Sequence, residues 1–584
     1  MITGMTAGVR EEPREAVRPR TPRRLPLPTL LALLVGFAGV GYRLALLFAD
    51  VPPTNSDEAT MGLAALHIAR GEGFPVWFYG QAYMGTLEAY LAAPLVALAG
   101  PSVLVLRLPT LALYALFLLL SWRLTRRLGG DRWYALLVVA VLALGADRVV
   151  KNQLIAGGGY PELNPAGAAL ALLTVGLCVR GPGARLPRWA AWGLISGVLL
   201  WVDPLILPYV LTLGVLLVAR RRRELAGRAG LVLAGALLLG AAPMLVDSIR
   251  HGRNPVTAVL AAGGSGAAAD WTDRLHGALV LGPPLAMGFC SPGRCATWQL
   301  WWAVAFPVLL VLAALTAWHT LRRASGRPGS AVRVSAGVRL ALLGGAAGVL
   351  AAYAVSNAAG QTPIESSRYL SCLAVAVPAL LWPLWQAARP LARPRQLAEV
   401  AASDPLTQRQ LAEVAASEGG GYGHLPEVES IKATGGRTAG PKARAAGVGA
   451  VAVLAGVLGT GAAATVEVIR AAPAVHAEAH RHRSLVDTLG ALGVRHVRGG
   501  YWTCNRLTYA TGENVLCAVV EDDLRPGFDR LPAYRREVAA DPGAAWVAPA
   551  GSPLAARLDE RLGTESGALD VVTVAGWRIY LPRR

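Results

Sequence analysis

Long apolar runs recur along the chain and are separated by short polar segments that contain arginine. Several runs are short or contain glycine and proline, which membrane helices tolerate where neighbouring helices satisfy the freed backbone groups. A helix needs roughly 20 residues to cross a bilayer, so the pattern predicts a polytopic α-helical membrane protein with about 11 transmembrane helices. The predicted spans are residues 25–49, 103–122, 133–150, 166–180, 189–202, 204–219, 229–247, 299–318, 339–355, 369–387 and 445–465.

Composition and charge agree with this class of protein. Of the 584 residues, 54% are hydrophobic and 16% are charged. The net charge of +19 does not indicate a nucleic acid partner, because the basic residues do not alternate with aromatic ones. The arginines lie between apolar runs, and the positive-inside rule places such segments in the cytoplasm. The basic segments lie near residues 123–132, 180–188, 220–223, 322–333 and 389–395.

The first span determines the predicted topology. A basic cytoplasmic tail, residues 1–24, precedes it, and no clear small-x-small cleavage site follows it. We therefore expect an uncleaved first helix with the N-terminus inside, which makes residues 50–102 a long external loop. Within that loop the apolar stretch 87–99 is too short to span, so it is predicted to be an interfacial or re-entrant helix on the outer face.

The same alternation of sides places residues 248–298 and the tail outside. Two local cysteine pairs fall there, Cys290 with Cys295 and Cys504 with Cys517. Disulfides persist in oxidising compartments, so bonds within these pairs would agree with the predicted sides. Four unpaired thiols are the alternative.

Residues 466–584 differ in composition from the transmembrane domain, residues 25–465. The runs 571–574 and 577–580 are typical of short strands, and a helical stretch over 484–492 precedes them. We predict a small extracytoplasmic α+β domain.

A cytoplasmic linker, residues 388–444, contains a helix-prone repeat at 395–403 and 409–417. The repeat is either a docking segment or, more simply, a tandem duplication in a tolerant linker.

Asp57 and Glu58 are the strongest candidates for chemistry. They follow the first apolar helix, at the predicted boundary between water and lipid. Ionised groups beside a bilayer carry a desolvation cost unless they are solvated or partnered, so their placement is usually functional. The alternative is that they are N-terminal charges of a helix over residues 59–70, with Ser56 or Asp57 as its N-cap.

With these features in order, the chain resembles the GT-C superfamily of membrane glycosyltransferases. Within it, the chain is most similar to the family 39-like bacterial enzymes related to dolichyl-phosphate-mannose-protein mannosyltransferases. The resemblance covers most of the chain except the N-terminal tail and the repeat loop. It rests on the order and common side of residues 55–59, 79–88, 107–109, 158–162, 367–370, 500–502 and 511–513.

The resemblance implies an inverting transferase that moves a mannose-like sugar from a polyprenyl phosphate to a hydroxyl of a lipid, glycan or protein. Such a displacement needs one general base. The phosphate leaving group is stable as an anion, so no second flanking carboxylate is required, unlike in glycosidases. Adjacent carboxylates point in different directions. We therefore predict Asp57 as the base and Glu58 as a group that orients the acceptor or a cation. A divalent cation is left open as a cofactor, and no metal-binding residues are predicted.

Arg368 is the predicted ligand of the donor phosphate, because arginine makes bidentate contacts with phosphate. Tyr369 lies beside it in the sequence. The alternative is an ordinary interfacial pair that reaches towards the headgroups. The other predicted donor- or acceptor-binding residues are Glu88, Gln81, Tyr83, Tyr160, Glu162, Lys151 and His67.

Some features depart from the resemblance. Related aminoarabinose transferases carry a Glu-Lys pair about where this chain has Gly85 and Thr86, so that metal or phosphate site is not carried over. The mannosyltransferases carry an insertion that is not evident here, which puts a protein acceptor in doubt. A glycolipid flippase and a non-catalytic envelope-assembly protein remain as alternatives, although most charges lie in loops and no halves repeat. The bias towards Ala, Gly and Arg points to a bacterial plasma membrane.

Overall fold

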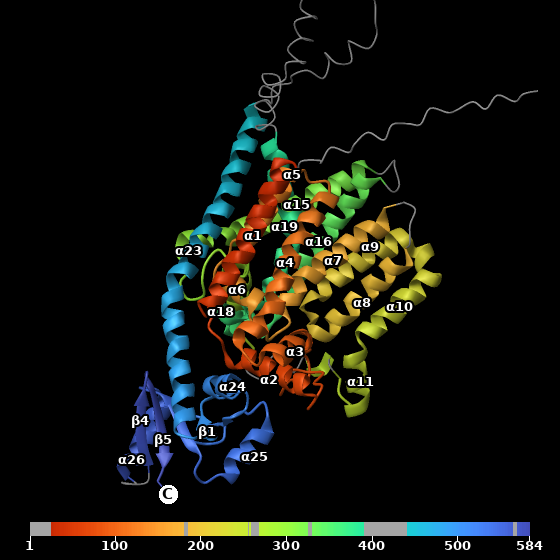
Figure 1. Cartoon of the computed structure of the whole chain (residues 1–584). Helices are drawn as coiled ribbons and strands as arrows, with labels where there is room; N and C mark the ends of the chain where they lie inside the picture. The colour runs from red at the N-terminus through yellow and green to blue at the C-terminus, as the bar shows by residue number, and fades with distance from the viewer. Residues whose placement is uncertain are drawn as a thin grey trace, which may run out of the picture.

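The computed structural model describes residues 25–179, 185–254, 256–258, 268–324, 330–389, 441–564 and 569–583. These residues form a helical bundle with a small α+β domain at one end (Figure 1). The predicted architecture, a polytopic helical protein with a C-terminal α+β domain, is confirmed. The predicted tail 1–24 lies outside the described residues, as does the repeat of the predicted linker.

The elements of the bundle and its outer loops follow one another along the chain. They are α1 (Leu27–Phe48), α2 (Ser56–Arg70), α3 (Leu87–Ala99), α4 (Val103–Arg127), α5 (Arg132–Ala143), α6 (Asp147–Leu154), α7 (Tyr160–Cys178), α8 (Leu186–Val202), η1 (Pro204–Ile206), α9 (Leu207–Leu225), α10 (Arg228–Gly240), α11 (Ala242–His251), α13 (Trp271–Leu275), η2 (His276–Leu281), α14 (Gly282–Ala286), η3 (Thr297–Trp301), α15 (Trp302–Arg323), α16 (Ala331–Val355), α17 (Asn357–Gln361), α18 (Pro363–Ser366), η4 (Ser367–Ala376), α19 (Val377–Leu380) and α23 (Pro441–Ala491).

Within the described part of the chain, seven helices are long and apolar enough to cross a membrane, and two bent helix pairs raise the number to nine. These helices correspond to nine of the predicted spans. The other two, 166–180 and 189–202, lie in α7 and α8. With 17 residues α8 is shorter than the helices that meet the criterion, and α7 begins with a polar turn that contains Glu162.

The prediction of a single helix over residues 133–150 is wrong. The chain bends by 92° between α5 and α6. At the bend, the Gly145 N–H donates to Thr465 Oγ1 (3.0 Å) and the Ala146 N–H donates to the carbonyl of Gly288 (3.1 Å). Because these amides find partners outside their own helix, the helix can break there without leaving buried backbone groups unpaired.

The predicted span 229–247 is also bent, by 61° between α10 and α11. Pro243 stands at the start of α11 and has no N–H to continue the helical hydrogen bonds. The last predicted span, 445–465, is part of the 51-residue helix α23, which runs through the predicted domain boundary at residue 466. One long helix therefore joins the bundle to the C-terminal domain (Figure 1).

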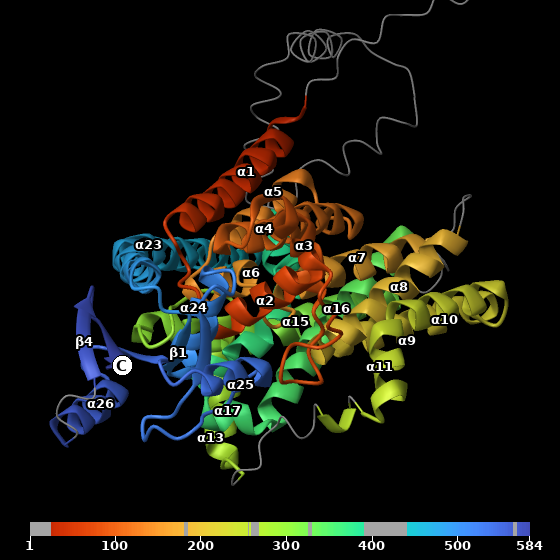
Figure 2. The same ribbon diagram turned by 60° about the horizontal axis from the view of Figure 1, so that its bottom comes forward.

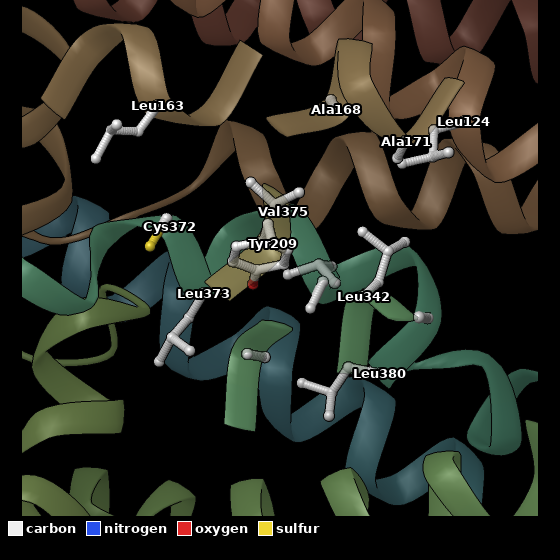
Figure 3. Packing of buried hydrophobic residues seen from close by; sticks show 14 of the residues in the cluster. Leu124, Leu163, Ala168, Ala171, Tyr209, Leu342, Cys372, Leu373, Val375 and Leu380 are labelled. Carbon is white, nitrogen blue, oxygen red and sulfur yellow. The ribbon is translucent and has the colours of Figure 1, made fainter. Parts of the chain in front are cut away.

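Apolar side chains from several helices fill the centre of the bundle. Figure 3 shows Leu163 and Ala171 of α7 with Tyr209 of α9, Leu342 of α16 and Leu373 of η4. All five side chains are buried. This packing holds the helices that carry the polar groups at the end of the bundle next to the C-terminal domain.

The external loop predicted for residues 50–102 contains α2 and the short helix α3, whose bounds match the stretch predicted to be too short to span. Both helices lie at the end of the bundle that meets the C-terminal domain (Figures 1 and 2). The predicted shared side of loop and tail agrees with this placement.

The C-terminal domain contains a five-stranded mixed sheet in the order β2-β1-β3-β5-β4. β1 pairs in parallel with β2 and β3, whereas β5 pairs antiparallel with β3 and β4. The predicted strands 571–574 and 577–580 are confirmed as β4 and β5. The elements are β1 (His496–Gly499), α24 (Tyr501–Ala510), β2 (Leu516–Val519), α25 (Pro532–Ala540), β3 (Ala545–Pro549), α26 (Pro553–Thr564), β4 (Leu569–Val574) and β5 (Trp577–Pro582).

Both predicted cysteine pairs form disulfides, Cys290 with Cys295 and Cys504 with Cys517. The alternative of four unpaired thiols is wrong. Cys178 and Cys372, which lie within predicted spans, are free and buried.

Candidate active site

The first turn of α2 presents the two adjacent carboxylates. Asn55 is the N-cap, since its side chain accepts a hydrogen bond from the Glu58 N–H (2.8 Å). The helix begins at Ser56, so the alternative in which Ser56 or Asp57 is the cap is wrong. Asp57 and Glu58 stand where the helix dipole favours negative charge. Their side chains point to different partners, as predicted.

Glu58 is buried and paired with Arg107 of α4. Arg107 donates from Nε to Oε1 and from Nη2 to Oε2, both at 2.6 Å, and Thr54 donates to Oε2 at 2.5 Å. This bidentate pair occupies both oxygens. Because Glu58 is also fully buried, it is not accessible to an acceptor or a cation, so the structure does not support the role expected for Glu58 or a cation site that uses both carboxylates. Glu58 instead holds α2 against α4.

The Asp57 side chain is a quarter exposed, and the hydrogen bonds to it come from the C-terminal domain. Tyr501 Oη donates to Oδ1 (2.7 Å), and Arg530 Nη2 donates to the same oxygen (2.9 Å). Among the described residues, no hydrogen bond reaches Oδ2. Asp57 therefore has one oxygen held and one oxygen available to accept a proton.

The glycine run before α7 packs directly on Asp57. A Cβ added at Gly157 would lie 3.3 Å from the Asp57 carbonyl carbon, and the φ of this glycine, +149°, is one that other residues rarely adopt. At the other end of the run, a Cβ on Gly159 would meet Val202 and Asp203. The run therefore joins the start of α2 to the turn between α8 and η1.

Arg368, at the start of η4, is the common neighbour of several of the predicted site residues. Its guanidinium lies 5.5 Å from the ring centroid of Tyr369 and within electrostatic range of Asp57 and Tyr160. Tyr83, between α2 and α3, is within electrostatic range of both Arg368 and Arg530. The Arg368 Nε is buried and has no hydrogen-bond partner in the described part of the chain. Five predicted residues thus gather here: Asp57, Tyr83, Tyr160, Arg368 and Tyr369.

Three buried carboxyl groups lie next to this group of residues. Glu88 of α3 and Glu162 of α7 interact with one another, and the backbone of Gly158 and Gly159 lies close to Glu88. Among the described residues, none of the four carboxyl oxygens makes a hydrogen bond of standard geometry. Asp203 lies near Glu162. Burial, and then the charge of Glu162, raise the pKa of Glu88. The pair has unused hydrogen-bonding capacity that a hydroxyl-rich ligand could satisfy.

Asp203 should make stability depend on pH. Burial raises the pKa of its carboxyl group to about 7. A hydrogen bond from the Leu205 N–H (2.8 Å) and the charge of Arg368 lower the pKa, but by less than burial raises it. The folded protein therefore keeps a proton that the unfolded chain releases above about pH 4, which costs stability as the pH rises. Asp203→Asn keeps an acceptor for Leu205, and its thermal midpoint should exceed that of the wild type by a margin that grows from about pH 4 to about pH 7.5. A margin that does not change with pH would contradict this assignment.

The structure places three predicted residues elsewhere. Lys151 pairs with Asp147 one turn away on α6 (2.9 Å). Gln81 lines an outer pocket with Tyr79 and Asp247, and its Oε1 is buried without a partner among the described residues. His67 lies at the contact between α2 and the C-terminal domain. The contacts of these residues do not bring them to Arg368.

His67 and Glu513 join the two domains. His67 Nε2 lies 2.9 Å from Glu513 Oε1, and Nδ1 lies 2.7 Å from Tyr79 Oη. Arg70 binds Glu513 Oε2, and Tyr534 donates to Oε1. His67, Glu72 and Glu513 place possible ligand atoms within 4.8 Å of one another, but both His67 nitrogens and both Glu513 oxygens already have protein partners. The cluster is therefore an interdomain contact, and the ligand atoms of His67 and Glu513 that a cation would need are already engaged.

Removing the charge of Glu513 should loosen this contact. Burial opposes ionisation of Glu513, but hydrogen bonds from His67 and Tyr534 and the charges of His67 and Arg70 outweigh it and lower the pKa to about 2. The stabilisation from the Glu513 charge is present above the unfolded pKa of about 4.3 and is lost as the pH falls towards 2. Glu513→Gln should speed hydrogen exchange of α24 and α25 at about pH 5.5. The matched control is Glu537→Gln, at an exposed position of α25, which should leave exchange unchanged. Equal exchange in wild type and Glu513→Gln would contradict the contact.

Sequence reasoning missed three residues of the site: Arg530, Tyr501 and Asp203. The Arg530–Asp57 contact spans 473 positions, and no local pattern signals such a separation. Tyr501 lies within residues 500–502, one of the segments on which the resemblance rests. That segment was the only sequence signal for Tyr501, and it did not indicate a contact with Asp57. Asp203 lies in the turn between α8 and η1, and its carboxyl group is buried, which no pattern in the sequence indicates.

No protein-family model matches the chain, and neither does any curated protein. Solved structures do match. ArnT from Cupriavidus metallidurans bound to undecaprenyl phosphate is 14% identical, with a TM-score of 0.51 over 95% of this chain and 97% of that one. Its apo state gives a TM-score of 0.52 over the same shares. The oligosaccharyltransferase of Archaeoglobus fulgidus in its apo form is 12% identical, with a TM-score of 0.43 over 90% of this chain and 69% of that one. The chain therefore shares the fold of ArnT over nearly the whole of both chains.

Proposed function

We propose that this protein is an inverting membrane glycosyltransferase that takes a sugar from a polyprenyl phosphate and transfers it to a hydroxyl group on the outer face of a bacterial plasma membrane. The acceptor would be a lipid, a glycan or a protein. The mannose-like sugar and the family 39-like grouping rest on the sequence resemblance. The fold shared with ArnT, which was solved with undecaprenyl phosphate, supports a lipid-phosphate donor.

The observation that carries the proposal is the state of Asp57. Its carboxylate is partly exposed, its Oδ1 is held by Tyr501 and Arg530, and its Oδ2 is free of partners among the described residues. A general base needs such an available oxygen close to the acceptor. Because both oxygens of the neighbouring carboxylate, Glu58, are bound by Arg107, the first turn of α2 offers one base rather than two.

The proposed reaction is a single displacement. The acceptor oxygen attacks the anomeric carbon while its proton passes to Asp57 Oδ2. The bond between the anomeric carbon and the phosphate oxygen breaks, and polyprenyl phosphate leaves as an anion. Arg368 supplies positive charge to that anion through a guanidinium whose Nε is free of protein partners in the described residues. Glu88 and Glu162 would accept hydrogen bonds from sugar hydroxyls.

Donor specificity tests the proposal. Purified protein in nanodiscs would receive radiolabelled sugars either on polyprenyl phosphate or on a nucleotide, with a cell-envelope extract as acceptor. We expect transfer and release of free polyprenyl phosphate from the lipid-linked donors alone. The absence of transfer from every lipid-linked donor by well-folded protein would overturn the proposal in favour of a flippase or an assembly protein.

A further inference from the structure

The C-terminal domain reaches the candidate base through Arg530, which follows β2 and precedes α25. Three atoms of its guanidinium donate to three different groups: Nη2 to Asp57 Oδ1 (2.9 Å), Nε to Tyr501 Oη (2.5 Å) and Nη1 to the Tyr79 carbonyl (3.1 Å). The guanidinium also lies 4.6 Å from the ring centroid of Phe78. The side chain is only 7% exposed. Arg530 is therefore held from several sides and has little freedom to act elsewhere.

Tyr501 completes the arrangement. Its hydroxyl accepts from Arg530 and donates to Asp57 Oδ1. Burial, and then the charge of Asp57, raise the pKa of Tyr501, so the phenol keeps the proton that it donates. The carboxylate thus receives two hydrogen bonds on one oxygen, which fixes the orientation of the other.

The two domains approach closely enough for this contact to be defined. Asn505 of α24 donates to Thr60 of α2 (2.7 Å), and Ser56 donates to the Tyr501 carbonyl. At Gly62, further along α2, a Cβ would lie 2.6 Å from the ring of Tyr509. Glycine at position 62 therefore permits α24 to lie against the helix that carries Asp57.

We infer that the C-terminal domain is an integral part of the active site, in which Arg530, together with Tyr501, acts as a positioning residue that holds Asp57 Oδ1 and leaves Oδ2 as the proton acceptor. The inference rests on the proposed function. It assigns the domain a role in each turnover, beyond capturing an acceptor or anchoring the protein. Arg530 differs in this from Arg368, whose Nε is not engaged by the described residues.

The test compares Arg530→Ala, Arg530→Lys and a matched control, Arg525→Ala, whose side chain is 83% exposed beside Asp523. Misplacement of a reacting group by about 1 Å can cost about 100-fold in rate, so Arg530→Ala should lower kcat by about that factor. The Kd for polyprenyl phosphate should stay unchanged. Guanidinium ion in the assay should restore part of the rate, and Arg530→Lys should retain an intermediate rate. Arg525→Ala should behave as the wild type.

The outcomes separate this inference from the proposed function. Full activity of Arg530→Ala, with an active wild type, would overturn the inference and leave the proposed function standing. A loss of activity that guanidinium does not restore, together with faster hydrogen exchange throughout α24, would show a merely structural role and would also overturn it. A wild type that transfers no sugar would remove both. Gly62→Leu is a second variant, which should separate α24 from α2 and lower kcat although every side chain around Asp57 is intact; unchanged kcat in that variant would contradict the role of domain contact.

Discussion

Asp57→Asn should lower kcat for sugar transfer by about 100- to 10,000-fold, the range typical for loss of a general base. Asparagine keeps an oxygen that can accept the hydrogen bonds of Tyr501 and Arg530. It cannot take the acceptor proton on the second position, because that position becomes an amide. The variant should therefore fold and bind donor as the wild type does.

The measurement is transfer under single-turnover conditions, with the Kd for polyprenyl phosphate determined in parallel. Asp147→Asn is a matched control, since Asp147 is a partly exposed carboxylate at the same end of the bundle and pairs with Lys151. It should leave kcat unchanged. Transfer by Asp57→Asn at the wild-type rate would exclude Asp57 as the base and would direct attention to Glu88.

Arg107→Met should be the most destabilising substitution in the outer part of the bundle. Both Arg107 and Glu58 are about 1% exposed, and removal of one member of a buried ion pair leaves an uncompensated charge, at a cost of about 3–5 kcal/mol. Arg107 Nη1 also donates to the Pro52 carbonyl oxygen (2.8 Å), and this carbonyl would lose its partner in the variant. We expect a large fall in the thermal midpoint of the purified protein.

The double variant Glu58→Met/Arg107→Met provides the control. Replacement of both members of a buried pair by apolar residues is often neutral or stabilising, so most of the lost stability should return. If the double variant is as unstable as the single one, the loss comes from packing and not from the unpaired carboxylate. A single variant as stable as the wild type would show that the pair does not hold α2 to α4.

The sequence was informative where local pattern determines structure. Apolar length was sufficient to predict the seven long helices and the places of the two bent pairs, though not their bends, and the short stretch 87–99 matches the bounds of α3. The bend at Gly145 could not be predicted, because the groups that stabilise it, Thr465 and Gly288, come from distant segments. A run of apolar residues does not show which backbone amides donate hydrogen bonds to groups outside the helix.

The same distinction applies to the site. Asp57 could be chosen because an ionised group beside a bilayer carries a desolvation cost, and Arg368 because arginine makes bidentate contacts with phosphate. Two adjacent acidic residues in a sequence do not show which of them is available as a base. Glu58 is engaged by Arg107, whereas Asp57 accepts a hydrogen bond from Arg530, and both arginines are distant in the sequence. Nor could the sequence show that His67 faces Glu513 and lies at the domain contact, since 446 positions separate the two residues.

The most direct test of the account is the anomeric configuration of the product. Purified wild-type protein would be supplied with an anomerically pure polyprenyl-phosphate sugar and an envelope-derived acceptor, and donor and product would be followed by NMR. A single base on α2 and a phosphate leaving group predict consumption of the donor and a product of inverted configuration. A product of retained configuration would contradict the single displacement at Asp57, and a donor that is never consumed would contradict the assignment as a glycosyltransferase.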